Sequence, residues 1–305
     1  MIDEPVFIVG VTRSGTTLFE QILNRHPRLS IYHESHFLRQ VWANANTTTL
    51  NAAQMREALA KTRNLASQGL KADTIERHFL ATDRSLHALY DTILRLRMEE
   101  NGKLRPGEKT PSNFWFLEVL FNWYPKARVI FMIRNPHSVH GSFKNFGKLA
   151  RMPWRDRMVF GRAFYWNYGA RVLKESQAKY PGQVMCVTFE TLVREPQKTL
   201  TTVCDFLGEV FHEDMLDIEA VNSSFDQTAQ QPGFRREALQ RHSHLSFLER
   251  LFIDGISGAY MLANGYPLAV LPRGVVRALE ALGFYTVLNL THDAIRNRRV
   301  HVLAL

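Results

Sequence analysis

A glycine loop between an apolar run and an amphipathic stretch is the feature that most constrains how this chain folds. Residues 10–17 read Gly-Val-Thr-Arg-Ser-Gly-Thr-Thr, with two glycines separated by four residues. Residues 5–9 before the loop are rich in β-forming side chains, and residues 17–23 after it carry apolar side chains at helical spacing. A strand, a glycine loop and a helix in this order cradle phosphate with backbone N–H groups. An ordinary glycine turn has the same spacing, so the loop alone leaves both interpretations open.

The loop departs from a nucleoside triphosphate site at one position. Thr16 stands where a P-loop carries its lysine, and the cation Arg13 lies three residues earlier. In a P-loop the lysine, the hydroxyl and a magnesium ion together hold the triphosphate. Here the hydroxyls of Ser14, Thr16 and Thr17, with the N–H groups around Gly15, are expected to bind an anion. The loop therefore predicts that phosphate is bound without the lysine at the usual P-loop position.

A second anion site is predicted after residues 128–133, a continuous apolar run typical of a strand buried on both faces. In a kinase or nucleotide-hydrolysing P-loop protein, a later strand ends in an aspartate that helps to hold magnesium, whereas this run ends at Arg134. Arginine suits bidentate contact with an oxyanion, and Ser138 and Ser142 follow on a predicted helix. A surface arginine ending a strand is the alternative. If both strand ends bind anions, one ligand with phosphates at two ends is the economical inference.

Alternation of strands and helices predicts the fold class. Further strands are expected at residues 28–33 and 183–189, with helices between the strands. We therefore expect a three-layer α/β fold with a mostly parallel sheet and P-loop-like nucleotide-binding topology. Residues 44–105 read as a helical insertion, and residues 1–267 as a single domain. The extension over residues 268–305 carries an amphipathic stripe, and is expected to pack on the domain or to form the interface of a homodimer.

Composition limits the possible size of the core, the class of partner and the location of the protein. A chain of 305 residues with 45% hydrophobic side chains can bury one large core, and a net charge of +9 favours acidic partners. No basic run is long enough to choose among nucleotides, anionic glycans, membrane surfaces and nucleic acid. Cys186 and Cys204 lie among apolar neighbours, which predicts reduced thiols rather than a disulfide. Neither a signal peptide before the first strand nor a transmembrane segment is expected, so the sequence predicts a cytoplasmic protein.

Several motifs together resemble the PAPS-dependent sulfotransferase family, in particular its bacterial, tyrosylprotein and heparan-type branch. The likeness extends over about residues 5–267 and includes, besides the loop and the strand ending at Arg134, the sequences at residues 33–37, 108–111 and 189–196. It implies transfer of a sulfonate group from PAPS (3′-phosphoadenosine 5′-phosphosulfate) with release of PAP and without a metal. By the same resemblance, the 5′-phosphosulfate is bound by Arg13, Ser14, Gly15, Thr16 and Thr17, and the 3′-phosphate by Arg134 and Ser142.

The resemblance also implies catalytic roles. Glu34 matches the glutamate that accepts the acceptor's proton in this branch, and Arg13 and Lys109 supply positive charge at the bridging oxygen and at the sulfonate or acceptor. A solvent lysine in a turn is the alternative for Lys109. His33 and His36 flank Glu34 and are expected to contact the acceptor or to orient the carboxylate. Their i, i+3 spacing differs from the i, i+4 spacing of a helical zinc pair, so no metal site is expected.

The last expectations concern a late basic loop and the acceptor. Arg235 and Arg236 resemble the basic residues that close over the 3′-phosphate and adenine. The acceptor is expected to be a hydroxyl or amine of a metabolite, glycan, lipid or peptide, not a nucleic acid. A P-loop kinase is the enzyme alternative, disfavoured by Thr16 and Arg134. A catalytically silent nucleotide-binding protein is the other alternative.

Overall fold

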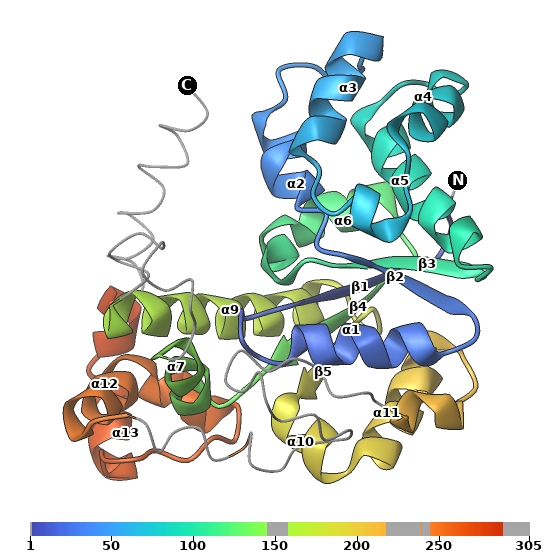
Figure 1. The fold of residues 1–305 in the computed structure, drawn as a ribbon. Helices are drawn as coiled ribbons and strands as arrows, with labels where there is room; N and C mark the ends of the chain where they lie inside the picture. The colour runs from blue at the N-terminus through green and yellow to red at the C-terminus, as the bar shows by residue number, and fades with distance from the viewer. Residues whose placement is uncertain (1, 145–157, 218–238, 240–244, 289–305) are drawn as a thin grey trace. The chain divides into compact units, whose positions relative to one another are not determined.

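The computed structural model describes residues 2–144, 158–217, 239 and 245–288 (Figure 1). These residues form two compact units, and each unit is described by itself. The first contains the described parts of Met1–Ile133 and Glu175–Val221, and the second contains those of Arg134–Lys174 and Arg235–Leu305. No helix of the described ranges is both long enough and apolar enough to span a membrane.

The first unit is built on a five-stranded sheet with the order β2-β3-β1-β4-β5. Every pair of neighbouring strands in this sheet is parallel, so the predicted parallel α/β architecture is confirmed. The strands are β1 (Val6–Gly10), β2 (Leu29–His33), β3 (Arg105–Lys109), β4 (Arg128–Ile133) and β5 (Val184–Thr188).

Helices cover both faces of this sheet, as the side chains of β1 show. Val6 and Ile8 join a buried apolar cluster with residues of α1 and α11, whereas Phe7 points to the other face and stacks on Tyr90 of α5 at 6.4 Å between ring centroids. Side chains that alternate between two buried faces require apolar residues at every position. Figure 1 shows the resulting three layers, with α1 (Thr16–Arg25), α10 (Phe189–Arg194) and α11 (Pro196–Leu207) on one face and α5 (Leu86–Glu100) and α6 (Leu117–Trp123) on the other.

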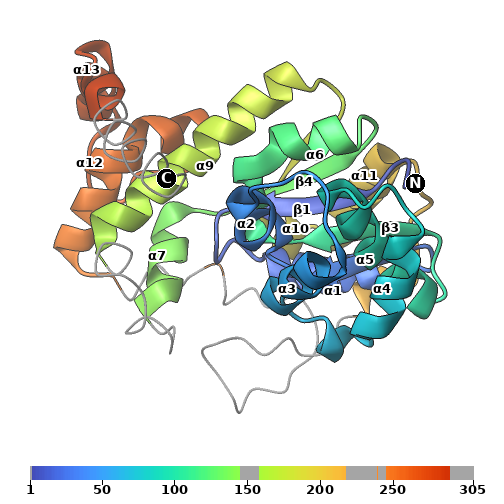
Figure 2. The same ribbon diagram turned by 90° about the horizontal axis from the view of Figure 1, so that it is seen from above.

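The chain between β2 and β3 is helical, as predicted for the insertion. Its helices are α2 (Phe37–Gln40), α3 (Ala52–Lys61), α4 (Ala72–Leu80) and α5, of which α3, α4 and α5 pack side by side (Figures 1 and 2). The helix α2 that follows β2 is short, because it begins only after His36, whose backbone is left-handed (φ 53°), and ends at Gln40. A short 3-10 turn, Trp42–Asn44, follows it.

Strand β3 was missed by the sequence prediction, which extended the helical insertion to Arg105. The strand reads Arg-Pro-Gly-Glu-Lys and contains none of the apolar alternation that marks a strand. Proline is also unusual in an inner strand because it cannot donate a ladder hydrogen bond. Gly107 explains why the strand fits between its neighbours: a Cβ at this position would lie 2.2 Å from the carbonyl oxygen of Val6.

The second unit is helical and includes part of the stretch beyond residue 267. It contains α7 (Pro136–Lys144), α12 (Phe247–Ala263) and α13 (Arg273–Ala281), while α9 (Val159–Lys179) begins in it. The buried carboxylate of Asp254 on α12 accepts hydrogen bonds from the backbone N–H groups of residues 269, 270 and 271 at 2.9, 2.6 and 2.9 Å. It also lies 3.0 Å from Nε2 of His137. These contacts fasten the segment before α13 to α12 and α7.

Candidate functional site

The glycine loop joins β1 to α1 and has the strained backbone that the spacing predicts. Gly10 has φ 145°, and a Cβ there would lie 2.1 Å from the carbonyl oxygen of Met132. Gly15 has φ 89°, and its Cβ would lie 2.4 Å from a ring carbon of Phe189. Arg13 adopts φ 74°, a conformation that residues with a side chain rarely take. Both glycines are therefore required by conformation and by close packing.

The start of α1 has the features of an anion site. Gly15 is the N-cap residue, no acidic side chain lies in the first turn, and no side chain caps the helix. The hydroxyl of Ser14 is fully buried and has no hydrogen-bond partner in the part of the chain that the structure describes. A buried polar group is costly without a partner, and an oxyanion at a helix N-terminus provides one. The residues from Ser14 to Thr17 thus fit a phosphate group.

Lys109 lies where the loop, α1 and two strand ends converge. It is the direct partner of His33 in the register of β2 and β3, so both residues end their strands at the carboxyl edge of the sheet. The Lys109 side chain is fully buried. Its Nζ lies 2.6 Å from Glu34 Oε1, 3.1 Å from Glu20 Oε2 and 3.2 Å from Thr17 Oγ1. The alternative of a solvent-exposed lysine in a turn is therefore wrong.

Glu34 and His36 lie directly after β2 in an unusual backbone conformation. Their φ angles are 46° and 53°, which are left-handed values for residues that carry a Cβ. The Nε2 atom of His36 lies 3.5 Å from Glu34 Oε2. Burial alone would raise the pKa of Glu34, but the hydrogen bond from His36 and the charge and hydrogen bond of Lys109 outweigh it and hold the pKa at about 2. Glu34 is therefore ionised, and it is a weak base while Lys109 is paired with it.

Glu20 is a member of this cluster that the sequence reasoning missed. It lies on α1, three residues after Thr17, and is 5% exposed. Its Oε2 lies 2.7 Å from His33 Nδ1 and 3.1 Å from Lys109 Nζ. The i, i+3 spacing from Thr17 places both side chains on one face of the helix, and this was the available sequence signal.

Glu108 supports the site from the opposite side of β3. Its Oε1 accepts hydrogen bonds from the backbone N–H of Ser35 (3.0 Å), from the Ser35 hydroxyl (2.5 Å) and from Thr110 Oγ1 (2.5 Å). Its Oε2 accepts from Asn113 Nδ2 (2.7 Å) and from the hydroxyl of Tyr90. A buried carboxylate needs such donors. Because it holds the backbone of Ser35, Glu108 fixes the segment that carries Glu34.

Arg134 and Ser142 belong to the second unit. Arg134 directly follows β4, is 3% exposed, and its carbonyl accepts a hydrogen bond from Trp166 Nε1 at 2.9 Å. Asn135 Oδ1 accepts from the backbone N–H of His137 at 2.9 Å and so caps the start of α7, on which Ser142 is also buried. Trp166 itself is fully buried. The helix cap and the tryptophan thus fix the backbone around Arg134.

Three further expectations concern residues outside this cluster. Arg235 and Arg236 lie outside the described residues. Cys186 and Cys204 have free thiols. Within residues 2–144, 158–217, 239 and 245–288, no group of three or more His, Cys, Asp or Glu side chains is arranged to hold a metal ion.

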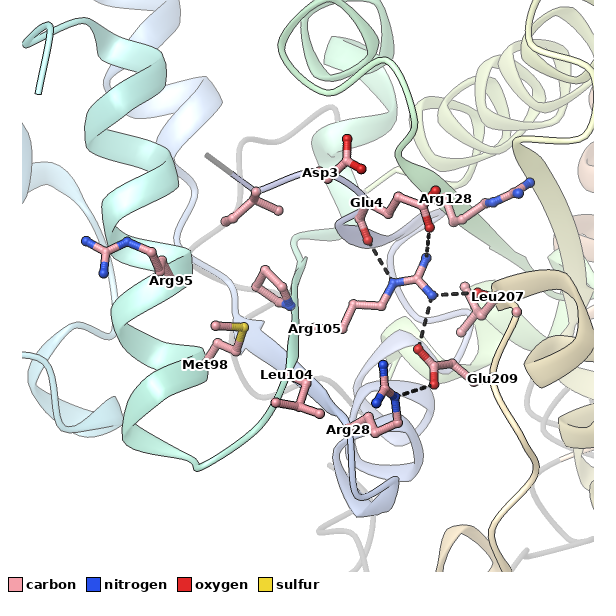
Figure 3. Close-up of a pocket in the computed structure, with 13 residues that line it drawn as sticks. Asp3, Glu4, Arg28, Arg95, Met98, Leu104, Arg105, Arg128, Leu207 and Glu209 are labelled. Carbon is pink, nitrogen blue, oxygen red and sulfur yellow. Dashed lines mark hydrogen bonds and ion pairs between the residues drawn. The ribbon is translucent and has the colours of Figure 1, made fainter.

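A cavity of about 560 Å³ lies in the first unit at the amino ends of the strands, away from the glycine loop (Figure 3). Its most enclosed cation is Arg105, which donates to the carbonyl oxygens of Glu4 (2.7 Å) and Leu207 (2.5 Å) and pairs with Glu209 at 3.2 Å. Glu209 also pairs with Arg28 at 2.9 Å. These ion pairs tie the N-terminal segment, β3 and the end of α11 together, which indicates a structural role.

Comparison with known proteins decides the family. A family model described as "Sulfotransferase family" matches residues 5–213. The chain belongs to the sulfotransferase family. The resemblance seen in its sequence motifs is thereby confirmed, and the enzyme class is that of a sulfotransferase.

Individual relatives of this sulfotransferase are distant. It is 24% identical over 218 residues to a candidate protein-tyrosine sulfotransferase of Caenorhabditis briggsae. The aligned region covers 70% of this chain and 69% of that protein. It is 25% identical over 224 residues to protein-tyrosine sulfotransferase 2 of Gallus gallus, of which it spans only 53%. The sulfotransferase domain of the Synechococcus PCC 7002 olefin synthase has the same fold, with a TM-score of 0.61 and 20% identity over 88% of this chain and 98% of that one.

Proposed function

We propose that this sulfotransferase moves the sulfonate group of PAPS to a hydroxyl or amine of its acceptor and releases PAP. Family membership supports the reaction type. The observation that carries the proposal is the position of Lys109, whose Nζ lies 3.2 Å from Thr17 Oγ1 of the glycine loop and 2.6 Å from Glu34 Oε1. The glycine loop, a cation and a carboxylate thus meet at one point, which supports in-line transfer from a phosphosulfate.

In the proposed reaction, Glu34 takes the proton of the acceptor group while the acceptor's lone pair forms the new bond to sulfur. The bond between sulfur and the bridging oxygen breaks, and its electron pair leaves with PAP. Arg13 and Lys109 neutralise the charge that develops on the bridging and sulfonate oxygens. The loop hydroxyls and N–H groups hold the 5′-phosphate. His33 and His36 are proposed to contact the acceptor.

The 3′-phosphate is assigned to Arg134 and Ser142, with Arg235 and Arg236 as further contacts. Arg134 and Ser142 are both buried, so a charge on the guanidinium is desolvated and favours a paired anion. Arginine presents its donors in a planar fork that matches a phosphate. This assignment makes recognition of the 3′-phosphate separable from recognition of the phosphosulfate.

The low pKa of Glu34 has a consequence for the order of events. A carboxyl group with a pKa of about 2 is a poor proton acceptor near neutral pH. If the donor's sulfonate draws Lys109 towards itself, Glu34 loses a cationic partner while it stays partly buried, and its pKa rises. We therefore propose that donor binding prepares the base before the acceptor reacts.

Calorimetry and a transfer assay test this function. The purified chain in EDTA is titrated with PAP and with ATP, and radiolabelled PAPS is then offered with a panel of metabolites, glycans, lipids and peptides. We expect PAP to bind without magnesium and label to pass to one acceptor class. Magnesium-dependent ATP binding without PAP binding would instead identify a kinase. PAP binding without transfer to any acceptor would identify a catalytically silent nucleotide-binding protein.

A further inference from the structure

We propose that Glu20 is a positioning residue that keeps Lys109 at the reacting sulfonate while Glu34 takes up the acceptor's proton. This inference rests on the sulfonate transfer proposed above. Glu20 contacts the cation of the site, Lys109, and is not proposed to touch the donor or the acceptor.

The two carboxylates around Lys109 differ in their surroundings. Glu20 Oε2 lies 3.1 Å from Lys109 Nζ, and its side chain is 7% exposed. Glu34 Oε1 lies 2.6 Å from the same nitrogen, but its side chain is 29% exposed. Glu34 is thus the more accessible carboxylate for an acceptor. Glu20 is enclosed, and it is carried by the helix whose N-terminus forms the proposed phosphate site.

Charge changes during the reaction show why a second carboxylate is useful. Lys109 is fully buried, and a buried ammonium group is stable only when an anion is paired with it. Glu34 becomes neutral when it takes the acceptor's proton, and so it stops balancing Lys109 at the moment when charge moves to the bridging oxygen. In the proposed reaction Glu20 takes no proton, so its carboxylate still faces Lys109 after Glu34 is protonated. It therefore holds the ammonium group in place across the step.

The negative charge of Glu20 also opposes binding of the anionic donor, and this makes the positioning role of Glu20 testable. Glu20 and Glu34 place two carboxylates around the single ammonium that they contact, so the carboxylate of Glu20 repels an incoming sulfonate. Removal of the Glu20 charge is expected to leave donor binding equal or tighter. Turnover is expected to fall, because Lys109 is less well positioned when Glu34 is protonated. A residue needed only for folding would not separate binding from turnover in this way.

The experiment is Glu20→Gln, which preserves side-chain size and one oxygen acceptor but removes the charge. Calorimetry gives Kd for PAP and, without acceptor, for PAPS, and a transfer assay gives kcat. We expect kcat to fall about 10- to 100-fold, as displacement of a reacting group does, with PAP affinity retained and PAPS affinity equal or higher. Glu20→Asp, which keeps the charge at a shorter reach, should give an intermediate kcat.

Glu209→Gln is the matched control. The Glu209 side chain is 6% exposed, as enclosed as that of Glu20, but it pairs with Arg28 and Arg105 at the opposite edge of the sheet. Its replacement should lower the Tm and leave kcat unchanged, so it reports the cost of removing a buried carboxylate from this unit.

Two results for Glu20→Gln would overturn the inference: a kcat equal to that of the unmodified enzyme, or a joint loss of kcat, PAP affinity and Tm larger than the loss in Glu209→Gln. Both differ from failure of the proposed function. If the unmodified chain neither binds PAP nor transfers sulfonate, the proposed reaction is wrong. If the unmodified chain is active and Glu20→Gln is equally active, only the role of Glu20 is wrong.

Discussion

The backbone N–H of Glu34 donates a hydrogen bond to the carbonyl oxygen of Lys109 at 2.8 Å, one residue beyond the end of β2. The side chains of the same two residues also pair, at 2.6 Å. The parallel ladder between β2 and β3 thus continues into the site. The proposed base and the proposed cation are therefore positioned by strand register rather than by the conformation of a long loop.

Replacing the proposed base tests its role. Glu34→Gln should lower the rate of sulfonate transfer by about 10²- to 10⁴-fold, because general base catalysis contributes this much. PAP affinity should be retained, since Glu34 contacts neither proposed phosphate site. Single-turnover transfer from PAPS and PAP calorimetry measure the two effects. Full turnover in this variant would show that another group accepts the proton.

The stability of the ligand-free chain should depend on pH through Glu34. The pKa of this group is about 2 in the folded chain against an ordinary 4.5, so its ionised form stabilises the fold above pH 4.5. This contribution is lost as the pH falls from about 4.5 towards about 2. Urea unfolding at a series of pH values should show the unmodified chain losing its advantage over Glu34→Gln in this window. A constant difference between the two would contradict the assigned pKa.

The 3′-phosphate assignment can be isolated by comparing two ligands. Arg134→Ala should weaken PAP binding by about 1.5–3 kcal/mol, the value of a charged hydrogen bond. The same variant should bind AMP, which lacks the 3′-phosphate, with unchanged affinity. Calorimetry with both nucleotides gives the comparison. Equal losses for AMP and PAP would mean that Arg134 acts on the fold or on another part of the nucleotide.

Backbone strain and close packing at Gly10 can be separated with a control glycine elsewhere in the first unit. Gly10→Ala should destabilise the chain by about 3 kcal/mol or more, because it combines backbone strain with an atom 2.1 Å from Met132 O. Gly182 also has positive φ (73°), but a Cβ there meets nothing within 4 Å. Gly182→Ala should cost only the strain, about 1–2 kcal/mol. Equal costs in chemical denaturation would show that the contact with Met132 relaxes.

Much of the fold was predictable because most strands follow simple rules. β1, the glycine loop and β4 have the apolar runs and turn residues that local rules recognise, and α11 begins at Pro196 and ends at Leu207, just before Gly208. β3 was not predictable, since Pro106 and Gly107 normally argue against an inner strand. Its place in the sheet depends on close approach to β1, which is a tertiary property.

The sequence named several residues of the candidate site, but it did not predict the contacts among them. Glu34 and Lys109 were found through a family resemblance, whereas their mutual pairing required β3 to lie beside β2. Glu20 was missed because a carboxylate inside an amphipathic helix looks like a solvated side chain until its partner is known. Residue roles, the domain boundary at residue 267, the homodimer and the cytoplasmic location stay predictions.

The hydrogen bond from Tyr90 to Glu108 links the helical insertion to the site in a way that limits which parts of the insertion can be exchanged. Tyr90 lies on α5, and Glu108 in turn holds Ser35 beside the proposed base. A chimera that exchanges the whole insertion with that of another sulfotransferase would therefore disturb the segment that carries the proposed proton acceptor. Asn64, between α3 and α4, also donates from Nδ2 to the carbonyl oxygens of His33 (2.9 Å) and Glu34 (3.1 Å), so exchange of the segment from α3 to α4 alone would disturb the same backbone by a second route.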